Sequence, residues 1–310
     1  MVIFKVAFSL LLPQFFYYMS YSIDQFSKIT GINKLLLRTW ENRYNFLTAE
    51  RTESKIRSYS DELLIKALNA KLLIDNGHKI SVISKKDDSE IELLLSELIH
   101  KKNKSSFNEY CVNNFIKSAL KFDTDTFNKT YSEASKKYTT IEFYKNIMLP
   151  TFSKIGLFWL TNKMNPAQEH FLSEMFKQKM YKQIDEESTY KNKKSKTWLL
   201  FLPPNEHHEM GLLFTRYLLT NYGYNVVYLG SNVPLPALNE IAKSTKIDFT
   251  LFFVVSNFSK LNISKTVESV NKYFSNCKNY VVANQSLEEK TMKKFKMNTI
   301  DSVDSFIKLL

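Results

Sequence analysis

The sequence predicts a multidomain protein with three kinds of architecture in order along its 310 residues. Residues 19–92 contain two short helices around a glycine turn, followed by a polar stretch that tolerates β structure. Residues 105–188 place apolar side chains at helical spacing throughout, and residues 196–310 alternate strands with helices. We therefore predict an all-α N-terminal part with a small wing, a central four-helix bundle, and a C-terminal α/β domain with a doubly wound parallel sheet.

Composition limits the class of protein further. Hydrophobic residues form 44% of the chain and aromatic residues 14%, which suits packed cores and argues against disorder. Cys111 and Cys277 are the chain's two cysteines, and they support neither a zinc cluster nor a disulfide framework. This cysteine usage favours a reducing, cytoplasmic setting.

Residues 1–18 are apolar but do not form a convincing signal sequence. The charged start is thin, no small-residue cleavage site follows, and Pro13 interrupts the run. The stretch is also too short to span a bilayer comfortably, so we expect no membrane partner. A true start at Met19 is an equal alternative, and no function is assigned to these residues.

The first segment has the pattern of a helix-turn-helix. Ser22 is placed to cap a helix over Ile23–Thr30, and Gly31 makes a tight turn. Asn33 is placed to cap a second helix that reaches about Asn42. Two short helices joined through such a turn are typical of this motif.

A wing and a further helix are expected next. Residues 51–59 are polar, basic and compatible with a small hairpin. Asp61 is predicted to cap a helix to about Asn76, Gly77 ends it, and Ser81–Ser84 begins another. From Lys28 to Arg57 there are seven basic and three acidic residues, so this part carries a local charge of +4 (7 − 3). Such a charge indicates a surface that faces phosphate.

The central segment ends in a distinctive arrangement. Trp159 is expected to end one helix, and Glu169-His170 follows after nine residues. Between them, Asn165-Pro166 is a good helix start, with Asn165 as the cap and Gln168 available to close a capping box. Glu169-His170 would then lie in the first turn of the next helix. By itself this pattern favours a plainer interpretation, a core tryptophan and a surface Glu-His pair.

In the third segment, predicted strands alternate with predicted helices. The predicted strands are 198–203, 225–229, 249–256, 280–283 and 298–300. The predicted helices are 211–222, 235–244, 263–274 and 303–310. This alternation is typical of parallel sheets, in which ligands bind at the carboxyl edge of the strands.

At that edge the sequence places Glu206-His207-His208-Glu209-Met210-Gly211, between a strand and a helix. An exposed imidazole beside a carboxylate suits one metal–nitrogen bond, with the carboxylate fixing the tautomer of His208. The alternative is a solvated loop that contains two histidines by chance.

The first segment resembles the MerR family of winged-helix transcription regulators. The residues that carry the resemblance are Tyr21-Ser22-Ile23, Thr30-Gly31-Ile32, Leu37-Arg38-Thr39-Trp40-Glu41-Asn42-Arg43-Tyr44, Arg51-Thr52-Glu53 and Arg57-Ser58-Tyr59-Ser60. It implies binding to a double-stranded DNA operator, with Arg38 and Arg43 on the helix that enters the major groove. The remaining candidate contacts to DNA are Lys34, Arg51, Lys55 and Arg57, of which the three wing residues would grip phosphate. For Trp40 and Tyr44 we favour core packing.

The third segment resembles the cobalamin-binding domain of methionine synthase and corrinoid proteins, a Rossmann-like, flavodoxin-like fold. Glu206, His208 and Gly211 match the family's acidic-x-His-x-x-Gly pattern. Ser256-Asn257-Phe258 stands where the family has Ser-x-Leu, and Ala283-Asn284 replaces a glycine pair. The resemblance implies that His208 binds the cobalt from below, that Glu206 holds the imidazole, and that Ser256 borders the nucleotide tail. Bulk at Ala283-Asn284 would narrow the groove for that tail.

The central segment resembles the cap over the upper cobalamin face in light-sensing MerR-type repressors. The resemblance implies that Trp159, Glu169 and His170 cover the upper axial group, adenosyl in the family's dark state. In that family a histidine follows the cap tryptophan, whereas this chain has Leu160, which cannot coordinate cobalt. Taken together, the resemblances imply a transcriptional regulator in which adenosylcobalamin, or light, controls a homo-oligomer (dimer or tetramer) on DNA.

Two other functions stay open. In one, the cobalamin domain has lost the cofactor and serves in oligomerisation. In the other, the chain is a corrinoid methyl carrier, although the sequence shows no acid–base or nucleophile constellation and we predict no enzyme. Dimerisation could use either the helix around 62–73 or the cobalamin domains.

Overall fold

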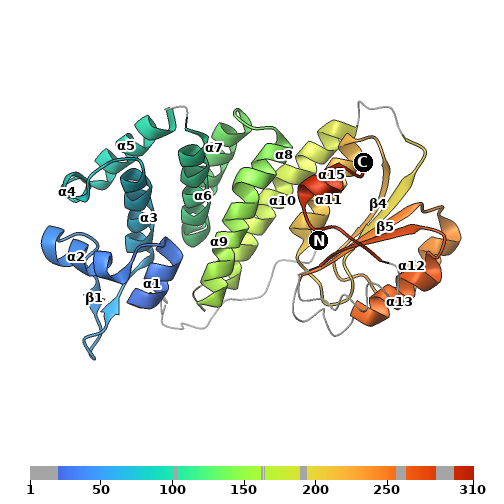
Figure 1. The fold of residues 1–310 in the computed structure, drawn as a ribbon, viewed down its shortest axis with the longest axis horizontal. Helices are drawn as coiled ribbons and strands as arrows, with labels where there is room; N and C mark the ends of the chain where they lie inside the picture. Colours follow the sequence, from blue (N-terminus) through green and yellow to red (C-terminus); the bar gives the residue numbers. More distant parts are fainter. Residues whose placement is uncertain are drawn as a thin grey trace, which may run out of the picture. The chain divides into compact units, whose positions relative to one another are not determined.

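The computed structural model describes residues 20–100, 103–161, 163, 165–188, 194–255, 263–283 and 297–310. These residues form two compact units (Figure 1). The first contains the chain up to Ser132 and Ile147–Gln168, and the second contains Glu133–Asn146 and Glu169–Leu310. The prediction for residues 1–18 lies outside the described residues. Within those residues, no helix has the length and apolar character needed to span a membrane.

The helix-turn-helix is confirmed. Helix α1 (Ile23–Thr30) begins with a capping box between Ser22 and Gln25 and ends at Gly31, whose φ of 70° lies in the left-handed region. Helix α2 (Lys34–Tyr44) begins at Asn33, whose side chain accepts a hydrogen bond from the Leu35 N–H. Both helix starts follow from local capping chemistry.

The wing is a short antiparallel pair of strands, β1 (Glu50–Arg51) and β2 (Arg57–Ser58). Helix α3 (Asp61–Asp75) follows it. The prediction that Asp61 caps α3 is wrong, because Ser60 has the extended backbone of a cap and its Oγ accepts the Leu63 N–H at 3.3 Å. Asp61 instead accepts the hydroxyl hydrogen bond of Tyr21 at 2.6 Å.

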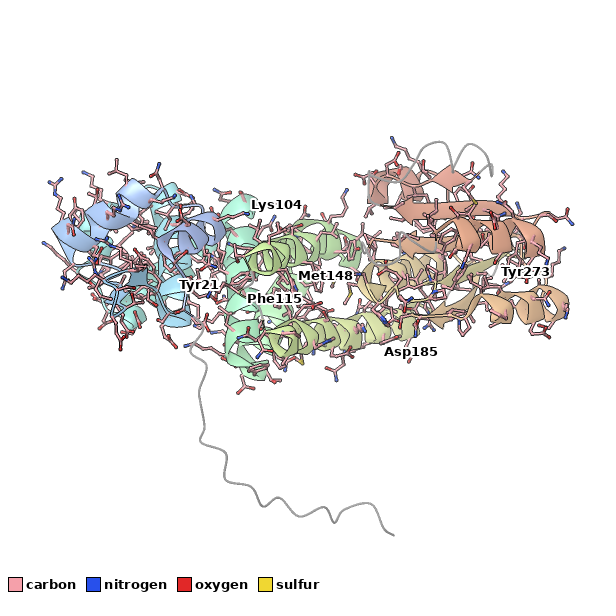
Figure 2. The ribbon with its side chains drawn as sticks, turned by 90° about the horizontal axis from the view of Figure 1, so that it is seen from below. Tyr21, Lys104, Phe115, Met148, Asp185 and Tyr273 are labelled. Atoms are coloured by element: carbon pink, nitrogen blue, oxygen red, sulfur yellow. The ribbon has the colours of Figure 1, made fainter. Side chains whose placement is uncertain are left out.

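The first unit continues with α4 (Ile80–Ile83), α5 (Asp88–His100) and α6 (Lys104–Lys121). Helix α5 has no counterpart in the sequence prediction. Its apolar side chains Ile91, Leu95 and Leu98 are buried, and the Glu92 carboxylate pairs with Lys117 of α6 at 3.0 Å. Phe115, labelled in Figure 2, is completely buried on α6.

Helix α9 (Leu149–Leu160) is docked against α1 in the first unit. The Phe158 ring lies edge-on to Tyr21, with 6.3 Å between centroids. The Gln25 side chain donates a hydrogen bond to the Thr161 carbonyl at 3.0 Å, just beyond the end of α9. The last turn of α9 therefore contacts the helix-turn-helix part directly.

The region predicted as a bundle is helical, and its elements are divided between the two units. After α6 come α7 (Thr124–Ser135) and α8 (Thr140–Phe143). A π-helical segment, Tyr144–Met148, joins α8 to α9 without a break. Helix α10 (Pro166–Ser188) completes the region.

The predicted parallel sheet is confirmed in the second unit. Its strands are β3 (Thr197–Phe201), β4 (Asn225–Gly230), β5 (Phe249–Val254), β6 (Lys278–Ala283) and β7 (Asn298–Thr299). The described strands lie in the order β4-β3-β5-β6-β7, and each neighbouring pair is parallel. The intervening helices are α11 (Glu209–Asn221), α12 (Leu235–Ser244), α13 (Ile263–Tyr273) and α15 (Val303–Ile307).

The sheet is covered on both faces (Figure 1). Leu199 and Phe252 point into an apolar core shared with α12 and α13. On the opposite face, Trp198 contacts Phe306 of α15, and Phe253 lies against Gly211 of α11. This alternation is what a strand with two buried faces requires.

Candidate functional site

The loop between β3 and α11 lies at the carboxyl edge of the sheet. From the end of β3 at Phe201, the chain leads through α11 to β4, which lies on one side of β3 in the sheet. Strand β5 lies on the other side of β3. Connections that diverge in this way create the crevice in which open α/β sheets bind ligands. His208 is the last residue before α11, and its side chain makes no capping bond to the helix.

Glu206 anchors this loop from beneath. Its side chain is completely buried. One carboxylate oxygen, Oε1, accepts the backbone N–H groups of His207 and His208 at 3.0 and 3.1 Å. The other, Oε2, accepts the N–H of Val255, immediately after β5, at 2.9 Å. A buried carboxylate needs such partners, and here they fix the loop to the ends of two strands.

The His208 imidazole is held at one nitrogen and open at the other. Its Nδ1 lies 2.6 Å from Glu206 Oε1, while 63% of the side chain is exposed. A carboxylate at Nδ1 favours the tautomer in which Nδ1 carries the proton, which leaves the Nε2 lone pair for a ligand. The hydrogen bond to Glu206 raises the pKa of His208, and the nearby charge of Glu169 acts in the same direction.

Gly211 is required by close packing. A Cβ at this position would lie 2.8 Å from the Phe253 ring, inside van der Waals contact. The first turn of α11 can therefore lie against β5 only because residue 211 has no side chain. This places the helix, and His208 before it, at a fixed height above the sheet.

A second polar cluster, missed from the sequence, surrounds Glu209. Its carboxylate accepts the Tyr228 hydroxyl at 2.8 Å and pairs with Lys177 of α10 at 3.1 Å. Burial and the hydrogen bond to Glu209 raise the pKa of Tyr228. The three side chains connect α10, α11 and β4 beside the His208 loop. Only long-range packing brings them together, so no local pattern could have revealed them.

The predicted cap residues lie at helix ends. Trp159 and Leu160 close α9, with 43% and 72% of the residue exposed. Glu169 and His170 lie near the start of α10 and are half-buried and exposed respectively. The Asn165 side chain accepts the Ala167 N–H at 2.9 Å.

The predicted helix start is confirmed, because the Gln168 side chain also accepts a hydrogen bond from the Asn165 N–H at 3.2 Å. Ala283, predicted near the nucleotide tail, is half-buried at the end of β6. Ser256 and Asn284 lie outside the described residues.

The exposed side of α2 presents Arg38 and Arg43. The Arg43 guanidinium lies 5.5 Å from the centroid of the Tyr44 ring. Lys34 pairs with Asp24 of α1. Trp40 is only 6% exposed and packs against Phe46, so its predicted core role is confirmed.

The wing arginines differ from those on α2. Arg57 binds Glu41 of α2 at 2.6 Å, and the Glu41 side chain is only 9% exposed. Arg51 lies 3.6 Å from the same carboxylate, with about half of its side chain exposed. Lys55 is exposed in the turn with a φ of 62°. Glu41 therefore links the wing to α2, and Arg57 forms the shorter of its two ion pairs with the wing.

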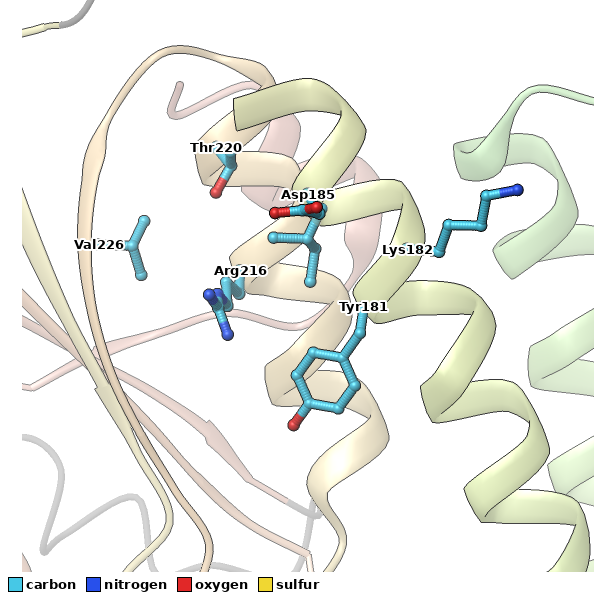
Figure 3. Close-up of a pocket in the computed structure, with 7 residues that line it drawn as sticks. Tyr181, Lys182, Asp185, Arg216, Thr220 and Val226 are labelled. Carbon is cyan, nitrogen blue, oxygen red and sulfur yellow. The ribbon is translucent and has the colours of Figure 1, made fainter. Parts of the chain in front are cut away.

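A cavity of about 490 Å³ opens elsewhere in the second unit, between α10, α11 and β4. Figure 3 shows Tyr181 and Asp185 of α10 facing Arg216 of α11, with Val226 of β4 opposite. Val226 is near the amino end of its strand, whereas the His208 loop follows the carboxyl end of β3. The residues that line this cavity do not include those of the His208 loop.

Comparison with known proteins identifies the two kinds of domain. Residues 21–90 match the MerR HTH family regulatory protein model, and residues 112–182 match the B12 binding domain model. The chain thus joins a MerR-type helix-turn-helix domain to a B12-binding domain. In fold, it resembles a monomethylamine corrinoid protein of Methanosarcina barkeri, with a TM-score of 0.54, 13% identity, and coverage of 65% of this chain and 97% of that one.

The chain is homologous to two repressors of Myxococcus xanthus. It is 24% identical to the HTH-type transcriptional repressor CarH over 251 residues, which cover 80% of this chain and 83% of CarH. It is 25% identical to the HTH-type transcriptional repressor CarA over 225 residues, 71% of each chain.

Proposed function

We propose that this protein is a transcriptional repressor that binds a DNA operator through α2 and the wing, and cobalamin through the β3–α11 loop. The state of the cofactor controls its oligomerisation and thereby its hold on DNA. The observation that supports this most is the His208 imidazole, oriented by a buried Glu206 and open at Nε2 on the carboxyl edge of a parallel sheet.

The residues present fit a corrinoid. The His208 imidazole would hold the corrinoid by supplying one nitrogen ligand to its cobalt. Glu206 keeps Nδ1 occupied, so that Nε2 is the nitrogen directed at cobalt. Ser256, Ala283 and Asn284 are the proposed neighbours of the nucleotide tail.

Trp159, Glu169 and His170 are the proposed cover of the upper axial group. The bound cofactor, as adenosylcobalamin, supplies a cobalt–carbon bond that light can break. Leu160 offers no nitrogen to cobalt, so a light response in this chain would proceed without a protein ligand from that position. Absorption spectra recorded before and after illumination separate a light sensor from a sensor of the cofactor alone.

On DNA, the exposed Arg38 and Arg43 of α2 enter the major groove, and Arg51 and Lys55 contact phosphate from the wing. Arg57 and Lys34 support this surface through their ion pairs with Glu41 and Asp24. For a 100-fold change in DNA occupancy, the cofactor states must differ by about 2.7 kcal/mol in their coupling to DNA binding.

Purification with adenosylcobalamin in darkness tests the cofactor assignment. We expect the wild-type protein to elute coloured, with a spectrum of histidine-ligated cobalt. His208→Ala should lose that spectrum and most of the bound cofactor. His207→Ala is the matched control, since His207 is also exposed and its N–H also binds Glu206. A colourless wild-type eluate, or equal cofactor retention in both variants, contradicts the assignment.

A second candidate is a regulator whose C-terminal sheet domain has lost the cofactor and serves only in oligomerisation. The replacement of a glycine pair by Ala283 and Asn284 favours it. This candidate requires the thermal midpoint and the DNA affinity to be the same with and without cobalamin. A methyl-carrier role finds less support, because the homologues are transcriptional regulators.

A further inference from the structure

Two leucines stand out on the exposed side of α2. Leu35 is 69% exposed and Leu36 is 48% exposed. Both lie in the first turn of the helix, directly after its Asn33 cap. The same helix buries Leu37 and Trp40 on its other side, so the apolar residues of α2 are divided between a core-facing and an outward-facing set.

Charge around the pair indicates what kind of partner covers it. Lys34 precedes the leucines, Arg38 follows one turn later, and Arg43 lies further along the exposed side. An apolar protein partner would have to desolvate these cations, whereas DNA pairs them with phosphate. The N-terminal residues of the second helix of a helix-turn-helix are also those that contact base edges.

One group in the major groove matches exposed leucine side chains. Among the base pairs, the 5-methyl group of thymine is the apolar feature presented there, and the other positions present hydrogen-bonding atoms. We propose that Leu35 and Leu36 read thymine methyl groups of the operator. Specificity then comes from apolar contact in the first turn of α2 and from Arg38 one turn later.

This inference rests on the proposed DNA binding and has a test of its own. A duplex is first selected by the wild-type protein from a random DNA pool. It is then synthesised in two forms, one with thymine and one with uracil at every thymine position. Uracil keeps the hydrogen-bonding groups and lacks only the methyl group, so the two forms differ in the feature that the leucines would contact.

We expect the uracil duplex to bind wild-type protein more weakly by about fourfold for each contacted methyl group, the change that burial of one such carbon gives. The double variant Leu35→Ala/Leu36→Ala should bind both duplexes equally. Leu93→Ala on α5, where the leucine is 61% exposed, should retain the wild-type preference. Alanine favours helix at both exposed positions, and circular dichroism verifies that the double variant is folded.

Each outcome has a distinct meaning. If no duplex is enriched from the pool, the proposed DNA binding fails. If wild-type protein binds thymine and uracil duplexes equally, or the double variant keeps a preference for thymine, the leucine inference is overturned while DNA binding stands. A double variant that changes oligomeric state and loses affinity for both duplexes equally would instead place the leucines in a subunit contact, which also overturns it.

Discussion

The His208 loop and the exposed side of α2 differ in how far the fold fixes their side chains before a ligand arrives. His208 is oriented by a completely buried carboxylate that also binds three backbone N–H groups. Arg38 and Arg43, by contrast, project from α2 into solvent. A metal ligand must present one lone pair in one direction, whereas a DNA surface must adapt to a long polyanion.

Mutagenesis should expose this difference. Substitution of Glu206 should lower stability and cofactor binding together, because its contacts serve both. Substitutions on the outer side of α2 should lower DNA affinity and leave stability unchanged. Stability and binding measured on the same variants test that separation.

The largest effect is expected for Glu206→Ala. It leaves the N–H groups of His207, His208 and Val255 without their acceptor. Because a hydrogen bond to a charged group contributes about 1.5–3 kcal/mol, the loss of three of them should lower the free energy of unfolding by about 3 kcal/mol or more. Urea unfolding of the cofactor-free protein measures it.

Glu240→Ala is the control for that measurement. Glu240 pairs with Lys243 and accepts a long hydrogen bond of 3.4 Å from the Asn239 side-chain amide on an exposed turn of α12, where the side chains of the ion pair are both more than 60% exposed. Its removal should change the free energy of unfolding by less than about 0.5 kcal/mol. Equal losses in the two variants would show that the Glu206 contacts do not stabilise the fold.

The next largest effects should distinguish two arginines of the DNA-binding part, one by its effect on stability and the other by its effect on DNA affinity. Arg57→Ala breaks the 2.6 Å pair with the nearly buried Glu41, so it should lower the free energy of unfolding by about 1.5–3 kcal/mol. Arg38→Ala should leave that free energy unchanged and weaken DNA binding by about 1–3 kcal/mol if it reads base edges, or flatten the salt dependence if it contacts phosphate.

Urea unfolding and a salt titration of DNA binding, performed on both variants, supply the comparison. A stability loss in Arg38→Ala as large as that in Arg57→Ala would contradict the division between fixed and adaptable side chains. Unchanged affinity and salt dependence in Arg38→Ala would mean that α2 does not face DNA.

Smaller effects are expected at two glycines. Gly211→Ala forces the Phe253 ring to move from 2.8 Å, and overpacking of this kind costs about 1–3 kcal/mol. Gly156 lies within α9, and a Cβ added there would meet nothing within 4 Å. Gly156→Ala should therefore stabilise the protein by up to about 1 kcal/mol, since alanine favours helix. Thermal midpoints of the two variants should shift in opposite directions, and a shared direction would contradict the packing argument.

Features decided by neighbouring residues could be predicted from the sequence. The caps at Ser22 and Asn33 follow from side chains that bond to N–H groups two or three residues away. The strands of the sheet can be located within a few residues because their side chains are apolar on both faces. Glu206 and His208 can be recognised as a pair because they stand two positions apart in one loop.

Features decided by distant contacts could not be predicted. Helix α5 could not be predicted because its apolar side chains form a buried face only where α3 and α6 pack against it. Ser60 and Asp61 are both good caps, and the choice between them depends on the bond of Asp61 to Tyr21, 40 residues away. The tie of Arg57 to Glu41, and the contact of Glu206 with Val255, likewise join parts of the chain that no local pattern connects.

The smallest expected effect concerns Asp61. Burial raises the pKa of this carboxyl above its usual range, against the hydrogen bond from Tyr21, which lowers it. A carboxyl with a raised pKa in the folded state favours folding when protonated, and this contribution is lost as the pH rises through the folded pKa. Asparagine keeps the acceptor for the Tyr21 hydroxyl and does not ionise.

Asp61→Asn should therefore gain stability relative to the wild type as the pH rises from about 4 to about 7. The gain should be less than about 1 kcal/mol, because the wild-type carboxylate in the first turn of α3 also interacts favourably with the helix N-terminus. Thermal midpoints of both proteins at the two pH values measure this difference. Glu62→Gln removes a smaller cause of the raised Asp61 pKa, the neighbouring negative charge, so it should gain less than Asp61→Asn if burial is the main cause. If the difference in thermal midpoint between Asp61→Asn and the wild type is the same at both pH values, burial does not disfavour the ionised form of Asp61.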